Sequence, residues 1–421
     1  MPRVQLAYGE TKIRADVPAA NFAYTVEPNP TQPIELDRAF ARGWAEPIGR
    51  EAPDQVVRPG ETLAILVPDH TRSVPTQALV SLLWERLRGR VRPQDVTVVV
   101  ATGTHRAPTP EELARILGPF RELFTVVVHD AAQCAPLGCT SRGTPVTVNQ
   151  AVLSADRVIT LGHVAMHYFA GYAGGPKMVL PGVAGAETIR LNHEQILAPQ
   201  ATACVYEENP IHAEMREVAR MAGVDLAVDV VLAGNGGALR VTVGDVVEAH
   251  RAAARFWDRT FQVPVPERVD VAIASPGGHP RDINLYQAHK AMFNAARIVR
   301  DGGMILLVAA CPDGSGHPAF EDWAGRSHDL QGVLAIMNAE GFKIGGHKVY
   351  FLAKDRARGV EHFLVSRLPP TAARALWMNP VASVQEGLAL ARERYGPSFS
   401  VGVLPFGGET FPVVAAEGAG G

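Results

Sequence analysis

Short runs of β-branched residues alternate with stretches of helical period along almost the whole chain. Continuous apolar runs predict strands, and apolar residues three or four positions apart predict helices. Residues 61–67 show the first pattern, and residues 75–88 show the second, with leucines at 79, 82, 83 and 87 on one face. Such alternation is typical of parallel strands joined by crossover helices, so the sequence predicts an α/β fold.

The same alternation continues toward the C-terminus. Further strands are expected at residues 95–101, 124–129, 157–161, 269–274, 304–309 and 398–404, and further helices from residue 109 and at 186–197, 209–221, 245–261, 283–299 and 383–395. Residues 226–232 and 238–243 flank an Asn-Gly-Gly turn and predict a hairpin. Two prolines interrupt both periods at residues 262–267, where we expect a hinge. The chain is thus expected to form two α/β domains with mainly parallel sheets, residues 1–264 and 265–421.

Composition excludes several classes of protein. Of the 421 residues, 47% are hydrophobic and 20% charged, which is typical of a soluble globular protein. The formal charge of −3 comes without a basic block, so a nucleic-acid partner is not expected. No apolar run approaches the ~20 residues that cross a membrane, and no signal peptide is evident, so we expect a cytoplasmic monomer or homodimer. The four cysteines show no metal or disulfide spacing and are expected to be reduced.

One segment, residues 163–182, holds an unusual density of His, Gly, Pro and Lys. It follows the predicted strand 157–161, and polar loops at 69–72 and 102–106 follow two others. Ligands collect at the carboxyl ends of parallel strands, so these three loops are expected to converge on one site. Gly171, Gly174 and Gly175 would let backbone N–H groups approach an anion such as a phosphate, although a tight loop without ligand explains the glycines too. The spacing matches neither a Walker A motif nor GxGxxG.

Individual side chains in these loops suggest chemistry. Lys177 lies between glycines and apolar residues, which would lower the pKa of its amine and make it nucleophilic, whereas most lysines are simply solvated. His193 falls on the predicted helix 186–197 and is a candidate nickel, copper or zinc ligand, although a lone helical histidine is more often structural. His163 and His167 would be a zinc pair only if their segment were helical, which its glycines disfavour.

Two further groups are candidates for acid–base chemistry and for anion binding. His105 and His167 would give two bases on opposite sides of a substrate, the arrangement that inversion of a stereocentre requires, but two unrelated loop histidines fit equally well. Arg72 and Lys290 are candidates to clamp a carboxylate or phosphate.

The sequence resembles the nickel-dependent lactate racemase family in five motifs spread over half the chain. They are DHTR (69–72), ATGTHR (101–106), HYFAGYAGGPKMVLPG (167–182), LNHEQ (191–195) and YQAHK (286–290). They occur in the family's order and with compatible spacings. The resemblance implies a racemase or epimerase of short 2-hydroxy acids that uses the nickel pincer nucleotide, a pyridinium mononucleotide holding nickel through two sulfurs and a ring carbon.

The resemblance also implies residue roles. The attachment lysine of the family falls on Lys177, its nickel-binding histidine on His193, and its acid–base histidines on His105 and His167. Further residues would contact the substrate or the cofactor: Arg72, Gln287 and Lys290 the anionic groups, and Asp69, Arg72, Gly174 and Gly175 the cofactor. Residues 1–264 would then bind the cofactor and residues 265–421 would close over the substrate, with the active site in the cleft between them. Cofactor-biosynthesis proteins would be the expected partners.

This chemistry suits a 2-hydroxy acid because direct removal of its Cα proton would create a dianion. Hydride removal, with a histidine taking the hydroxyl proton, gives a 2-oxo acid instead, and hydride return to the other face inverts the centre.

The chain departs from the family pattern at Pro176, where some relatives have Arg. It departs again near residues 345–352, where lactate-specific members have a tryptophan and this chain has His347 and Tyr350. We therefore expect a short 2-hydroxy acid as substrate, with a second polar group or a longer chain tolerated better than in a strict lactate racemase. The alternatives are a zinc hydrolase or lyase built on His163, His167 and His193, and a non-catalytic carrier of nickel or nucleotide.

Overall fold

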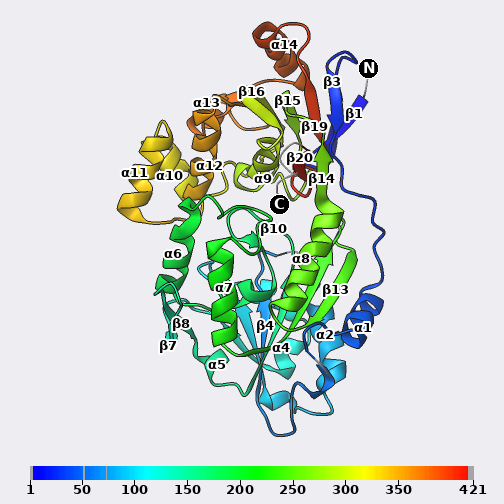
Figure 1. Ribbon diagram of the computed structural model, residues 1–421, viewed down its shortest axis with the longest axis vertical. Coiled ribbons are helices and arrows are strands. Elements are labelled where there is room, and N and C mark those ends of the chain that lie inside the picture. Colours follow the sequence, from blue (N-terminus) through cyan, green and yellow to red (C-terminus); the bar gives the residue numbers. More distant parts are fainter. Residues whose placement is uncertain (1–2, 51–52, 73, 416–421) are drawn as a thin grey trace. The chain divides into compact units, whose positions relative to one another are not determined.

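The computed structural model describes residues 3–50, 53–72 and 74–415, which divide into two compact units. The central unit comprises Thr31–Arg259, and the terminal unit comprises the described parts of Met1–Pro30 and Thr260–Gly421. Each unit is built around a six-stranded, mainly parallel sheet with helices on it, so the predicted α/β class is confirmed (Figure 1).

The central sheet has the strand order β13-β12-β9-β4-β5-β6, and β13 is its one antiparallel strand. Its strands are β4 (Leu63–Pro68), β5 (Val96–Ala101), β6 (Thr125–Val128), β9 (Arg157–His163), β12 (Val224–Leu232) and β13 (Ala238–Gly244). All six residues of β4 are buried, as expected for a parallel strand covered on both faces. The chain runs from β4 to β5 and β6 on one side and from β9 to β12 and β13 on the other. The order therefore reverses between β4 and β9.

Helices and short elements surround this sheet. The helices are α1 (Leu36–Ala45), α2 (Thr76–Leu87), α3 (Pro110–Leu117), α4 (Phe120–Leu123), α5 (Gln150–Leu153), α6 (Ala186–Glu194), α7 (Pro210–Met221) and α8 (Glu248–Phe261). The 3₁₀ turns are η1 (Pro53–Gln55), η2 (Pro93–Asp95), η3 (Gly175–Met178) and η4 (Gln195–Leu197), and the hairpins are β7 (Cys134–Cys139) with β8 (Pro145–Asn149) and β10 (Met166–His167) with β11 (Gly171–Tyr172).

The period-two alternation of the strands assigns these elements to the two faces of the sheet. Alternate strand residues such as Ile65, Val98 and Val228 join one apolar core with α1 and α2. The intervening residues face η3, which packs over β9, β4 and β12 and is backed by α7. Helices α7 and α8 lie in front of the sheet in Figure 1. The glycine-rich segment therefore lies on the face opposite to α1 and α2.

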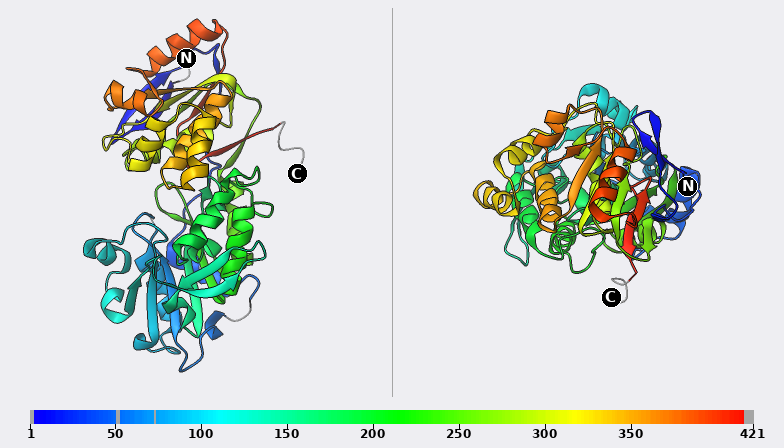
Figure 2. Two further views of the ribbon diagram at one scale, coloured as in Figure 1. Left: turned by 90° about the vertical axis from the view of Figure 1, so that its left-hand side faces the viewer. Right: turned by 90° about the horizontal axis from the view of Figure 1, so that it is seen from above.

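The terminal sheet has the order β18-β17-β16-β15-β19-β3, and every pair in it is parallel. Its strands are β3 (Phe22–Thr25), β15 (Val269–Ala274), β16 (Val299–Val308), β17 (Glu361–Val365), β18 (Asn379–Pro380) and β19 (Val401–Leu404). Its helices are α9 (Leu285–Ala295), α10 (Pro318–Arg326), α11 (Leu330–Glu340), α12 (Gly346–Ala357), α13 (Pro370–Ala375) and α14 (Val384–Tyr395). The hairpin β1 (Arg3–Tyr8) with β2 (Thr11–Asp16) shares its core with α14, and Figure 2 shows these N-terminal strands, in dark blue, beside that helix.

The units differ from the expected division at the N-terminus. Residues 3–30 were expected in the first domain, but β3 pairs with β19 and Leu6 is fully buried in the terminal core. The expected boundary at 262–267 lies a few residues from the observed division between Arg259 and Thr260. Gln262–Val265 itself forms strand β14, which pairs in parallel with β20 (Phe411–Val414). Proline is tolerated there because a two-stranded sheet leaves one side of each strand without a ladder partner. The predicted hairpin at 226–243 is confirmed as β12 and β13.

Candidate active site in the central unit

The site residues of the central unit follow the carboxyl ends of three neighbouring strands. Asp69 and Arg72 come after β4, His105 comes after β5, and the glycine-rich segment comes after β9. The loops after β4 and β9 leave the sheet where its strand order reverses, which is the usual place for a ligand in such folds. Gly103 N–H donates to the Gly182 carbonyl at 2.9 Å, which joins the β5 loop to the glycine-rich segment. The expected convergence of the three loops is confirmed.

Asp69 and His105 form a hydrogen-bonded pair. The Asp69 carboxylate is 3% exposed, and its Oδ2 lies 2.7 Å from His105 Nδ1. Its Oδ1 accepts from the Thr71 hydroxyl at 2.6 Å and from the Thr71 N–H at 3.1 Å. Burial works to raise the pKa of Asp69, but the bonds from His105 and Thr71 and the charge of Arg72 outweigh it, so the pKa lies below its usual value. An ionised carboxylate on Nδ1 fixes the imidazole's orientation and tautomer and favours Nε2 as the base.

The segment after β9 folds back on itself, with His167 opposite Gly171 in the hairpin of β10 and β11. It is not helical between His163 and His167, as the glycine content predicted. Gly174 and Gly175 then adopt φ of +82° and +46°, which glycine accepts without strain. Gly175 was expected to offer its N–H to an anionic cofactor, but that N–H donates to Asp229 Oδ1 at 2.8 Å. This amide is therefore used within the protein.

Lys177 lies in η3, directly after these glycines. Burial, together with the positive charge of Arg72, lowers the pKa of Lys177 to about 7, and the charge of Asp69 opposes this shift. The guanidinium of Arg72 stays largely exposed. Because about half of the Lys177 side chains would be neutral at pH 7, this amine is a nucleophile under ordinary conditions.

His193 lies on α6 with 5% of its surface exposed. Burial, and to a smaller extent the charge of Lys177, lowers the pKa of His193 to about 3. Its Nδ1 lies 3.2 Å from Asn192 Oδ1, and Asn192 is itself anchored by its amide to Glu214 at 2.8 Å. The imidazole is therefore neutral and held in place, as a metal ligand must be.

The Phe169 ring packs against both His167 and His193. Its centroid lies 4.6 Å from that of His167 and 5.2 Å from that of His193, edge to face in both pairs. His167 also accepts from the Ala170 N–H at 3.3 Å through Nδ1. An aromatic spacer thus fixes the separation of a candidate acid–base group and a candidate metal ligand.

Gln287 and Lys290 belong to the terminal unit, on α9. Asn284 caps this helix by accepting from the Gln287 N–H at 2.9 Å. Gln287 and Lys290 are three positions apart, so both side chains lie on one side of the helix, about one turn apart. Lys348, on α12, is 1% exposed with its ammonium 4.8 Å from the Tyr286 ring centre, and sequence reasoning did not identify it.

Asp229 and His250 are two further polar residues at the glycine-rich segment that the sequence analysis missed. Both side chains are completely buried. For Asp229 the sequence does hold an indication, because a carboxylate in the middle of the apolar run 226–232 has to be buried and therefore needs a hydrogen-bond partner.

The alternative zinc site finds no support in the geometry. Among the residues that the structure describes, no three His, Cys, Asp or Glu side chains form a group able to hold a metal ion, and this includes His163, His167 and His193. Any metal on His193 would therefore need its other ligands from a bound cofactor or from solvent.

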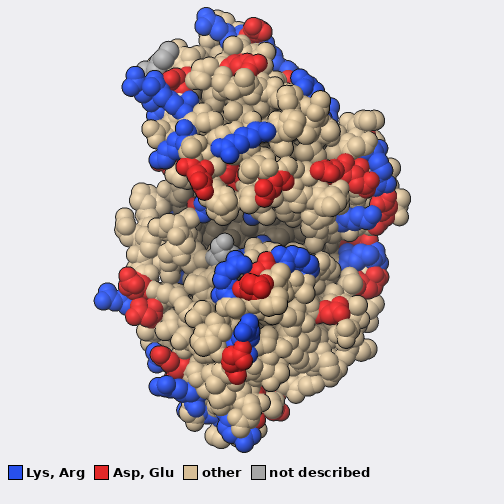
Figure 3. Space-filling view, turned by 180° about the vertical axis from the view of Figure 1, so that it is seen from behind, with Lys and Arg blue, Asp and Glu red and all other residues tan. Residues whose placement is uncertain are grey.

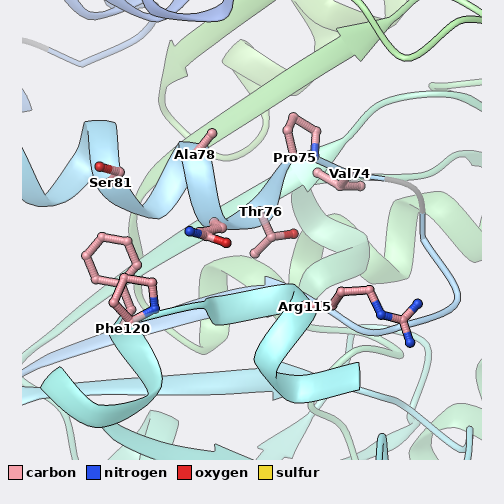
Figure 4. A pocket seen from close by; sticks show the side chains of 9 residues that line it. Val74, Pro75, Thr76, Ala78, Ser81, Arg115 and Phe120 are labelled. Carbon is pink, nitrogen blue, oxygen red and sulfur yellow. The ribbon is translucent and has the colours of Figure 1, made fainter. Parts of the chain in front are cut away.

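Two grooves on the described surface are lined by none of the predicted site residues, and one of them, in the terminal unit, is lined by polar side chains that include Glu361, His362 and Arg374. A groove in the central unit is lined by side chains near the start of α2 and from α3 and α4, including Val74, Thr76, Arg115 and Phe120, and by none of the predicted site residues (Figure 4). On the face in Figure 3, basic and acidic side chains are interspersed. No helix within the described ranges combines the length and apolar character needed to cross a membrane.

Family models and relatives match most of the chain. Residues 8–204 match the lactate racemase N-terminal domain, and residues 265–410 match the lactate racemase C-terminal domain. A lactate racemase of Thermoanaerobacterium thermosaccharolyticum is 30% identical over 79% of this chain and 80% of its own length. A lactate racemase of Lactiplantibacillus plantarum is 31% identical over 76% of this chain and 77% of its own length.

Solved structures give the same result. The lactate racemase apoprotein of T. thermosaccharolyticum superposes with a TM-score of 0.92 at 26% identity, covering 98% of this chain and all of that one. A Thermotoga maritima protein shares the fold, with a TM-score of 0.66 at 16% identity over 92% of this chain and all of its own. The resemblance seen in the motifs is thereby confirmed.

The perturbed amine of Lys177 leads to a first prediction. In protein without cofactor, acetylation of Lys177 should rise with pH to a midpoint near 7 and then level off, whereas exposed Lys12 should keep gaining reactivity to about pH 10. Arg72→Ala should raise the midpoint because a positive neighbour is removed. Brief labelling followed by peptide mass spectrometry measures both, and a Lys177 midpoint above pH 9 would contradict the assignment.

Proposed function

This chain belongs to the lactate racemase family, and we propose that it is an isomerase that racemises or epimerises short 2-hydroxy carboxylic acids. The observation that carries the proposal is the Asp69–His105 pair, formed beside the loop of Lys177 where the strand order reverses. A carboxylate-oriented imidazole next to a neutral amine supports proton transfer at a ligand held by that amine.

The residues present fit a nickel pincer nucleotide. The Lys177 amine is reactive near neutral pH, and His193 is a neutral, buried and oriented imidazole. Lys177 would hold the nucleotide covalently, and His193 would supply the protein's ligand to nickel. When bound, the group supplies an acceptor and donor of hydride at the substrate's Cα. The related structure is of an apoprotein, which supports a cofactor requirement in that relative.

The chain's own residues would carry out the remaining steps. His105 Nε2 accepts the hydroxyl proton of one enantiomer as Cα loses its hydride, and a planar 2-oxo acid results. His167 performs the same role for the other enantiomer and returns a proton to oxygen when hydride reaches the opposite face. Arg72 would hold the substrate carboxylate, and Gln287 and Lys290 on α9 of the terminal unit are the further candidates to bind an anionic group. The 2-oxo acid is consumed in each turnover, so no net oxidation occurs.

Covalent attachment is the test of this function. Protein made with the cofactor-biosynthesis proteins should carry a nucleotide adduct on Lys177 and about one nickel per chain, and protein made without them should carry neither. Lys177→Ala should abolish adduct and activity, and His193→Ala should lower the nickel content. Intact mass, peptide mapping and metal analysis measure this, with exposed Lys354→Ala as the control. Full racemase activity in Lys177→Ala would end the proposal.

The two histidines should be needed in both directions of the reaction. His105→Ala and His167→Ala should each slow racemisation by ~10² to 10⁴-fold, because each enantiomer requires one as base and the other as acid. Exposed His328→Ala is the control and should retain activity.

A carrier without catalysis would bind cofactor and show no such loss. Substrate deuterated at Cα should keep its label in the product, as hydride transfer requires. Rapid exchange of the label with solvent would instead indicate proton abstraction.

The terminal unit leads to a substrate prediction. His347, Lys348 and Tyr350 are buried polar residues on the first turns of α12, and the Lys348 ammonium lies beside Tyr286, the neighbour of Gln287. We therefore expect malate, glycerate or sugar acids to be better substrates than lactate or 2-hydroxybutyrate, because a site that binds a polar group rejects analogues lacking it.

A panel of single enantiomers assayed by chiral chromatography measures this preference. Lys348→Met should lower the kcat/KM ratio of malate to lactate about tenfold or more, and Lys354→Met on the same helix should not. Wild-type turnover of lactate far faster than of every larger or more polar acid would refute the prediction.

A further inference from the structure

Asp229 of β12 and His250 of α8 form hydrogen bonds to the backbone of the glycine-rich segment. Asp229 Oδ1 accepts from the Gly175 N–H at 2.8 Å, and His250 Nε2 lies 2.9 Å from the Ala173 carbonyl oxygen. A carbonyl only accepts, so Nε2 of His250 is the protonated nitrogen. Nδ1 lies 3.1 Å from the Tyr206 hydroxyl oxygen, and that hydroxyl also lies 3.0 Å from the Val247 carbonyl oxygen. Burial lowers the pKa of His250 to about 4, so the imidazole is neutral.

The same two side chains explain the glycines. A Cβ on Gly162 would lie 2.2 Å from Asp229 Oδ1, and one on Gly174 would lie 3.0 Å from it. A Cβ on Gly175 would lie 2.5 Å from His250 Cγ. The distances at Gly162 and Gly175 are shorter than a real Cβ contact allows, and the distance at Gly174 is tighter than most such contacts. The backbone can approach these side chains so closely because glycine has no Cβ. The glycines serve contact with Asp229 and His250, in addition to any contact with a ligand.

In the sequence, the residues that Asp229 and His250 bind lie between two groups proposed to act in the reaction. Ala173 and Gly175 separate His167 from Lys177, and the Lys177 N–H donates to the Gly174 carbonyl at 3.0 Å. The Gly182 N–H in turn donates to the Lys177 carbonyl at 3.2 Å. The position of the Lys177 backbone therefore depends on the conformation of residues 173–175.

We propose that Asp229 and His250 are positioning residues, which set the conformation of residues 173–175 and thereby the placement of Lys177. They act as hydrogen-bond partners of the backbone, so what matters at residue 229 is an acceptor at Oδ1, and at residue 250 a donor at the position of Nε2. This inference deepens the proposed function, because correct placement of Lys177 matters most if that lysine holds the cofactor.

The test measures amide hydrogen exchange at Lys177 and Gly182, whose N–H groups touch neither Asp229 nor His250. In protein without cofactor, Asp229→Ala and His250→Ala should speed this exchange about tenfold, since a buried hydrogen bond is lost. Asp229→Asn and His250→Gln keep an acceptor and a donor and should stay within about twofold of wild type. Leu87→Ala, in the apolar core on the other face of the sheet, controls for general destabilisation and should leave the exchange of this segment unchanged.

The proposal is overturned if Asp229→Ala exchanges like wild type, if Asp229→Asn exchanges as fast as Asp229→Ala, or if Leu87→Ala has the same effect. A second arm uses protein loaded with cofactor, in which Asp229→Ala should lower kcat about tenfold or more with KM nearly unchanged, and Asp229→Asn should restore kcat. If wild-type protein never acquires an adduct on Lys177, the proposed function fails. The hydrogen-exchange experiment, which uses protein without cofactor, still tests whether Asp229 and His250 position the segment.

Discussion

The reversal of strand order between β4 and β9 is the constraint on which the central unit depends. Parallel strands need long crossover connections, and the connections after β4 and β9 depart toward opposite sides of the sheet. The space between them is left for the polar loops at their carboxyl ends. Asp69 can reach His105, and the segment of Lys177 can lie over β9 and β4, because no crossover occupies that position.

Burial then gives the loops their chemistry. Removal of water disfavours the charged forms of both Lys177 and His193, so the pKa of Lys177 falls to about 7 and that of His193 to about 3. Asp69 is buried as well, yet it remains ionised because His105 and Thr71 donate to it. One environment therefore yields an amine that titrates near neutral pH, a neutral imidazole and an ionised carboxylate. Hydrogen bonding decides which group keeps its charge.

Local patterns in the sequence predicted the parts of this site that depend on local structure. Strand ends follow from apolar runs, so the positions of Asp69, His105 and the glycine-rich segment could be predicted, and the helical period placed His193 on α6. Contacts between residues far apart in the sequence leave no comparable local pattern. The partner of a glycine N–H cannot be identified from the glycine, so Gly175 was assigned to a ligand although it binds Asp229. In the sequence Lys348 resembles any other helical lysine, and only the packing of α12 against α9 places it beside Tyr286.

The pairing of β3 with β19 has a consequence for biosynthesis. Strand β3 leaves the ribosome before the central unit does, and β19 leaves it after the central unit. The terminal sheet therefore cannot be completed until β19 has been translated, whereas the central unit is a continuous segment that can fold while the ribosome is still at work. Residues 3–30 must wait through that interval with Leu6 and Phe22 uncovered. The newly made chain thus carries an apolar segment that chaperones can recognise until its last strands emerge.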